Sequence, residues 1–150
     1  MDSLFDNKPL LVGTLFFILI LICVIHELIH GLFFSMLAEG KFKSVKFGIM
    51  PAKKLFSFYC QCKEKLRLNQ YRIAIIMPLI ITGIIPAIVS ILIGDNLLFS
   101  WSIICILLAG DDILILLKTS KEKKNVWIFD HPTKGGYYVY RELKDYNGGT

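Results

Sequence analysis

Residues 10–38 read LLVGTLFFILILICVIHELIHGLFFSMLA, and this stretch decides how the rest of the chain must be arranged. It is apolar apart from a few small residues and three ionisable side chains, His26, Glu27 and His30. A helix of this length, at about 1.5 Å per residue, crosses a bilayer core of roughly 30 Å. Ionisable groups are costly at that depth and need a partner or a function. The stretch therefore predicts a membrane-spanning helix that carries a functional site.

The spacing of the two histidines predicts a metal site. Residues four apart lie one turn apart on the same face of a helix, so His26 and His30 can direct imidazole nitrogens at a single ion. Zinc prefers such nitrogen ligands in a tetrahedral site. Glu27 would stand beside the ion rather than on it, which suits a general base acting on metal-bound water. We therefore expect Zn²⁺ as cofactor, His26 and His30 as metal ligands, and Glu27 as the catalytic residue.

Two further apolar stretches predict membrane spans, at about residues 73–93 and 97–117. Only Gly-Asp-Asn at 94–96 separates them, so we expect an antiparallel helical hairpin. With 55% hydrophobic residues and a mean hydropathy of +0.59, the chain of 150 residues is too apolar for an ordinary soluble protein. The predicted fold is one all-α membrane domain over residues 1–150, with three transmembrane helices, the first at about 10–38.

The net charge of +5 is unevenly distributed, and its distribution predicts the topology. Nine Lys and Arg residues lie between Glu39 and Arg72 and seven follow from residue 118 onward, whereas the N-terminal segment has one. By the positive-inside tendency, the loop and a short soluble tail at about 118–150 are cytoplasmic, and the N-terminus is outside. We expect a multi-pass protein of the cell membrane whose partner is the lipid bilayer and not nucleic acid.

A third metal ligand must come from elsewhere in the chain, because catalytic zinc sites usually have three protein ligands and one open position. The last predicted span contains Asp111 and Asp112, and intramembrane carboxylates are functional candidates by default. Asp112 lies six residues before Lys118, about 9 Å along a helix, and His30 lies eight residues before Ala38, about 12 Å. The two groups thus have similar depths.

Adjacent helical residues point about 100° apart, so only one of the two carboxylates, Asp111 or Asp112, is expected to bind the metal. We favour Asp112, with Asp111 as the alternative ligand or as a hydrogen-bond partner of a ligand histidine.

The loop between the first two spans predicts a β-hairpin at about residues 42–62. Its two halves are rich in aromatic and β-branched residues with partial alternation, and Pro-Ala-Lys-Lys at 51–54 separates them. A hairpin with one apolar and one basic face suits the cytoplasmic headgroup region. Cys60 and Cys62 are expected to be free thiols, because two cysteines without further partners make a weak metal site.

These motifs resemble those of a known group of membrane peptidases. HELIHG at 26–31, GDDIL at 110–114 and FDHPTKGGYYV at 129–139 are similar to small bacterial zincin peptidases, first grouped as a domain of unknown function and related to site-2 intramembrane zinc proteases. The resemblance implies a zinc-dependent hydrolase that cleaves membrane protein or peptide substrates, and an edge of the hairpin that receives substrate. It favours Asp112, which directly precedes an aliphatic residue. The chain departs from well-studied site-2 proteases, which have Leu-Asp-Gly where this chain has Ala-Gly-Asp-Asp-Ile at 109–113.

Two other functions are compatible with the sequence. One is a membrane-anchored peptidase that acts on soluble peptides, which the depth of Glu27 disfavours. The other is a non-enzymatic, metal-binding membrane protein with a regulatory or immunity role. Glu27 argues against the second, because metal binding alone does not need that carboxylate. The sequence leaves the substrate and the oligomeric state open.

Overall fold

One long helix, α2 (Lys8–Leu37), corresponds to the first predicted span. The helix is apolar on all sides over most of its length, as expected for a segment surrounded by lipid. It ends in a turn, and Lys41–Ser44 then form a short 3₁₀ helix before the first strand begins. The computed structural model describes residues 8–51, 56–123, 125–131 and 136–141.

The second helix begins five residues earlier than predicted and ends where predicted. It consists of α3 (Leu68–Pro78), a π-helical segment η2 (Leu79–Ile84) and α4 (Ile85–Ile93). Proline cannot donate a backbone hydrogen bond to the preceding turn, and η2 follows Pro78 directly. Gly94 then takes a left-handed conformation with φ 71°, which ends the helix and turns the chain back.

The third predicted span is broken rather than continuous. It forms α5 (Asn96–Leu108) and α6 (Gly110–Ser120), which are bent by 49° relative to each other. Glycine is a poor helix former, and Gly110 stands at the break. Two helices of the described chain, α2 and the α3–α4 helix, are long and apolar enough to cross a membrane, and a third span results if the bent pair counts as one.

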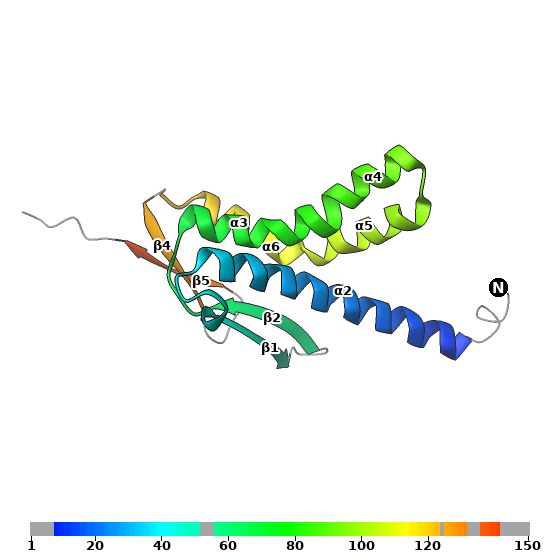
Figure 1. Ribbon diagram of the computed structural model, residues 1–150, viewed down its shortest axis with the longest axis horizontal. Coiled ribbons are helices and arrows are strands. Elements are labelled where there is room, and N and C mark those ends of the chain that lie inside the picture. Colours follow the sequence, from blue (N-terminus) through cyan, green and yellow to red (C-terminus); the bar gives the residue numbers. More distant parts are fainter. Residues whose placement is uncertain (1–7, 52–55, 124, 132–135, 142–150) are drawn as a thin grey trace, which may run out of the picture.

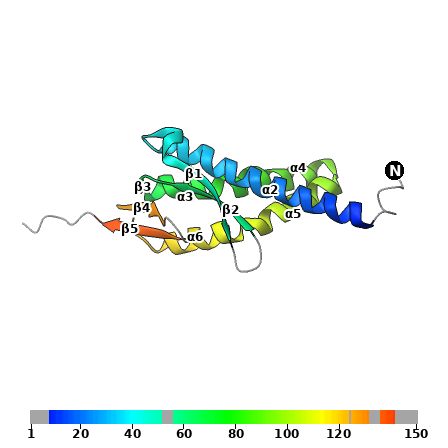
Figure 2. The same cartoon turned by 90° about the horizontal axis from the view of Figure 1, so that it is seen from below.

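The predicted hairpin is confirmed. β1 (Val45–Pro51) pairs with β2 (Phe56–Cys62) in an antiparallel two-stranded sheet. The strand starts a few residues later than expected, and residues 52–55 of the predicted turn lie outside the described residues. In Figure 1 the hairpin lies beneath α2, and in Figure 2 it lies in front of the helices.

The prediction of an all-α domain with a short soluble tail is corrected in one respect. The tail forms part of a second small sheet and packs on the rest of the domain. β3 (Leu66–Arg67), β4 (Val126–Asp130) and β5 (Tyr137–Arg141) form an antiparallel sheet in that order. Alternate residues of β4 are buried, which is the pattern of a strand with one face on a core. The tail thus packs on the residues that precede α3 and becomes part of the domain.

The core lies at the end of the molecule where α2, α3 and the two sheets meet. Phe34, Leu68, Tyr71 and Ile128 are almost completely buried there. Away from this end, α2 and the α4–α5 hairpin diverge from each other (Figure 1) and expose large apolar side chains. Such exposure would be costly in water and suits a lipid environment.

Candidate metal centre

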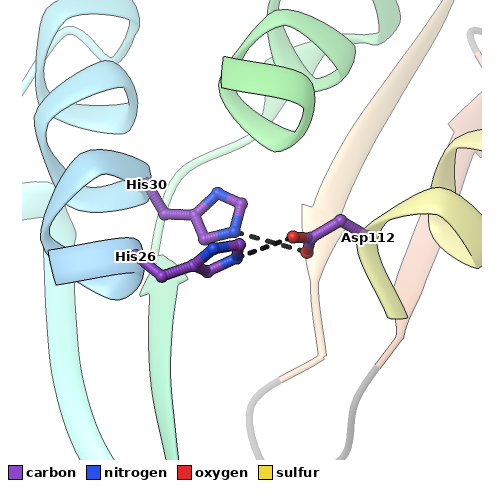
Figure 3. A group of neighbouring side chains, drawn as sticks. All are labelled: His26, His30 and Asp112. Atoms are coloured by element: carbon purple, nitrogen blue, oxygen red, sulfur yellow. Dashed lines mark hydrogen bonds and ion pairs between the residues drawn. The ribbon is translucent and has the colours of Figure 1, made fainter. Parts of the chain in front are cut away.

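The structure brings His26, His30 and Asp112 together. The two histidines project from α2 and the aspartate projects from the first turn of α6 (Figure 3). Nε2 of His26 lies 2.8 Å from one carboxylate oxygen of Asp112, and Nε2 of His30 lies 3.3 Å from the other. One donor atom from each residue lies within 4.8 Å of the other two. Both histidines are buried and Asp112 is partly buried.

Local structure explains why these three side chains converge. The four-residue spacing places both imidazoles on one face of α2. The break before Gly110 sets Asp112 in the first turn of a new helix that packs against α3, which in turn packs against α2. Asp111, one residue earlier, points about 100° away and is exposed. Of the two adjacent carboxylates, the structure therefore places Asp112 beside the histidines and leaves Asp111 outside the group.

A backbone carbonyl fixes the orientation of His30. Nδ1 of His30 lies 3.0 Å from the carbonyl oxygen of Ala74 in α3. Since a carbonyl only accepts hydrogen bonds, Nδ1 carries a proton, and in a neutral ring Nε2 would then direct its lone pair towards Asp112. A lone pair facing a carboxylate is favourable only with a proton or a cation between them. Two imidazole nitrogens and a carboxylate oxygen are the ligand types that zinc prefers, and this donor set fits it.

His26 is held differently. Its Nε2 faces Asp112, whereas its buried Nδ1 has no hydrogen-bond partner among the described residues. We expected Asp111 as a possible outer partner of a ligand histidine, but neither histidine is bonded to it. The outer partner that the structure provides is the Ala74 carbonyl, on His30 alone. The ligand roles of His26, His30 and Asp112 stay predictions, since their arrangement and not metal binding is observed.

Glu27 lies beside the group rather than in it. Its carboxylate is close enough to His30, His26 and Asp112, and to the backbone N–H of Cys60 in β2, for electrostatic interaction. The side chain is partly buried. A carboxylate in this place can accept a proton from a water near the metal-binding group, as its place in the motif predicts.

The other candidate metal-binding residues lie outside the group. Cys60 and Cys62 are free thiols, as expected. Burial raises the pKa of both thiols above the usual range, that of Cys62 to about 11, so both are protonated at neutral pH. His131 stacks on Tyr138 with ring centroids 4.9 Å apart. It was not predicted to be a ligand, and the described structure gives it no part in the group.

The family model described as "Putative zincin peptidase" matches residues 19–127, which include both histidines, Glu27 and Asp112. The chain belongs to this family. Membership indicates a zinc metallopeptidase and makes zinc the implied metal. No curated protein and no solved structure gives a significant match.

Sequence reasoning missed two backbone groups of the site. The Ala74 carbonyl orients His30, and the Cys60 N–H interacts electrostatically with the Glu27 carboxylate. Both come from elements that pack on α2, namely α3 and β2. Every residue carries these groups, so no residue type could have signalled them. What could be anticipated is that a buried metal-binding histidine has a partner for its second nitrogen.

Proposed function

We propose that this zincin is an intramembrane metallopeptidase of the site-2-protease type, acting on membrane-associated protein or peptide substrates. The observation that carries the proposal is the convergence of His26 and His30 from α2 with Asp112 from α6, with Glu27 beside them. Three protein ligands leave one position open, which is typical of catalytic and not structural zinc sites.

The residues divide the chemistry among themselves. His26, His30 and Asp112 would hold the metal. Zinc supplies a Lewis acid that acidifies water and polarises a carbonyl group. Glu27 takes the proton from the attacking water and passes it to the leaving amine, and the Cys60 N–H lies near enough to interact with this carboxylate.

Two features support a membrane location for the chemistry. The two histidines lie on α2, a helix with the length and composition of a membrane span. His30 lies seven residues, or about 10 Å, before the end of this helix at Leu37. Exposed basic residues gather around the sheet end of the chain, which supports a cytoplasmic position for that end and an outside N-terminus. They are Lys41, Lys43, Lys46, Lys63, Lys65, Arg67, Lys118, Lys121 and Lys123.

The decisive experiment uses the Glu27→Gln variant purified in detergent. It should bind zinc like the parent, because the substitution leaves the three predicted ligands in place. It should lose turnover by about 10²–10⁴-fold, the usual contribution of a general base. Zinc content is measured by elemental analysis, and cleavage is measured on a panel of single-span and soluble peptides, with and without chelator. Parental cleavage by this variant would show that Glu27 is not the base.

A matched control separates loss of the base from loss of a charge. Glu39→Gln changes an exposed glutamate just beyond the end of α2 and should keep both zinc and turnover. Cleavage of soluble peptides alone would favour a membrane-anchored peptidase. Stoichiometric zinc without cleavage of any substrate by the parent would favour the non-enzymatic regulatory or immunity protein.

A further inference from the structure

Asp130, the last residue of β4, is a carboxylate buried in the core beside the metal-binding group. It is 9% exposed, and Val126 and Ile128, four and two residues earlier, are buried on the same face of the strand. The alternation of β4 would place an apolar residue at this position. Burial raises the pKa of the Asp130 carboxyl above its ordinary value, although hydrogen bonds to it act in the opposite direction. A polar group in such a place needs partners, and Asp130 has several.

Three hydrogen bonds join Asp130 to two other elements. One carboxylate oxygen accepts from the Tyr71 hydroxyl of α3 at 2.7 Å, and the other accepts from the backbone N–H of Cys62 in β2 at 2.9 Å. The Gln61 side-chain amide donates to the Asp130 carbonyl at 3.5 Å. A single residue of the C-terminal sheet therefore holds both α3 and β2.

The hydrogen bond to the Cys62 N–H connects Asp130 to Glu27 through strand β2. In an antiparallel strand, alternate residues direct their N–H groups to the same edge, so Cys60 and Cys62 share the edge of β2 that faces away from β1. The Glu27 carboxylate interacts electrostatically with the backbone N–H of Cys60, and Asp130 accepts a hydrogen bond from the next N–H on that edge, about 7 Å along the strand. Asp130 thereby fixes the strand segment whose Cys60 N–H interacts with the Glu27 carboxylate.

The hydrogen bond from the Tyr71 hydroxyl connects Asp130 to His30 through helix α3. Tyr71 lies three residues before Ala74 in α3, and the Ala74 carbonyl accepts from Nδ1 of His30. The Tyr71 ring lies 6.0 Å from the Phe34 ring, which is stacked 6.3 Å from the His30 ring. Tyr71 thus holds in place both the carbonyl that orients His30 and the aromatic ring behind it.

We propose that Asp130 is a positioning residue of the metal site, acting on Glu27 through β2 and on His30 through Tyr71 and α3. The part that concerns Glu27 rests on the proposed peptidase function, whereas the part that concerns His30 requires only metal binding. Asp130 lies beyond residues 19–127, so the match to the family does not include it. The C-terminal strand is then part of the site and not only of the fold.

The test compares Asp130→Ala, Asp130→Asn and Tyr71→Phe with Val126→Ala, a control that removes buried atoms from the same face of β4. Two measurements do not need activity: zinc affinity, by competition with a chromophoric chelator, and amide hydrogen exchange of β2. Asp130→Ala should weaken zinc binding about 10–100-fold, as loss of outer partners does, and should speed exchange in β2. Tyr71→Phe should weaken zinc binding and leave exchange in β2 unchanged.

The conservative variant and the control make the result specific. Asp130→Asn keeps an oxygen for the Cys62 N–H and an amide for the Tyr71 oxygen, so it should recover most of the zinc affinity and the β2 protection. Val126→Ala should lower the unfolding temperature and change neither measurement. If Asp130→Ala behaves like Val126→Ala, or if Asp130→Asn is as impaired as Asp130→Ala, the inference is wrong. If Asp130→Ala does not fold, Tyr71→Phe decides, and parental zinc affinity in that variant overturns the role at His30.

Activity then distinguishes this inference from the proposed function. If the parent cleaves peptides, Asp130→Ala should lower kcat more than it raises KM at saturating zinc, because alignment of the base is lost. If the parent binds zinc but cleaves nothing, the peptidase function fails. The zinc and exchange measurements still decide the role of Asp130.

Discussion

The two halves of α2 are both largely apolar but have different surroundings. From Lys8 to Leu21 no side chain is buried in the protein. From Ile22 to Leu37 buried residues recur every four positions, along a stripe made of Ile22, His26, His30 and Phe34. In the first half, hydropathy alone determines which residues are suitable, since any apolar residue faces lipid equally well. Specific contacts specify the second half, and substitutions there should have far larger effects.

The largest effect is expected where the stripe meets α6. Asp112→Asn or His30→Ala removes a predicted ligand and should weaken zinc affinity more than loss of an outer partner does, by more than about 100-fold. Asp111→Asn is the matched control, because Asp111 is adjacent, acidic and exposed. Its zinc affinity should equal that of the parent. Titration against a chromophoric chelator measures all three variants.

Equal losses for Asp111→Asn and Asp112→Asn would contradict this selectivity. They would indicate that the charge of the pair, and not the position of one carboxylate, governs metal binding. A loss confined to Asp111→Asn would reverse the assignment of the ligand.

The two glycines of α2 provide a second comparison between the halves. A Cβ atom at Gly31 would collide with the Phe47 ring of β1, whereas a Cβ atom at Gly13 would meet nothing within 4 Å. Gly31→Ala should therefore destabilise the protein by about 1–3 kcal/mol, the usual cost of overpacking. Gly13→Ala should be neutral or stabilise it by up to about 1 kcal/mol, because alanine favours the helix. Thermal unfolding in detergent measures both.

A double variant checks the cause of the Gly31 effect. Phe47→Ala removes the ring that the new methyl group would meet, so Gly31→Ala should no longer destabilise the protein in that background. An unchanged penalty would mean that docking of the hairpin on α2 is not what requires glycine at this position.

The same contrast explains what the sequence could predict. The predicted spans at 10–38, 73–93 and 97–117 rest on composition, because a lipid-facing helix needs no particular partner. The structure has a long apolar helix at the first two and a bent pair of helices at the third. The convergence of His26, His30 and Asp112 could be anticipated because each is an ionisable residue in an apolar run. The pairing of β3, β4 and β5 was not predicted, since a short alternating strand is a weak signal beside long hydrophobic runs. The bend before Gly110 was not predicted either. The Ala74 carbonyl and the Cys60 N–H could not be predicted, because backbone groups leave no mark in a sequence.

The smallest expected effect is on the stability of the turn that follows α2, and this effect should depend on pH. Glu64 accepts hydrogen bonds from the Ser44 hydroxyl and the Gly40 N–H, and these bonds lower the pKa of its carboxyl below the usual value of 4.5. A lowered pKa in the folded state means that the stabilisation is fully present above about pH 4.5 and is lost as the pH falls through the folded-state value. The unfolding temperature of Glu64→Gln should therefore lie slightly below that of the parent at pH 7, and the difference should vanish in acid. A difference that stays constant from pH 7 to acid would show that Glu64 acts through packing. The charge of its carboxylate would then not stabilise the turn after α2.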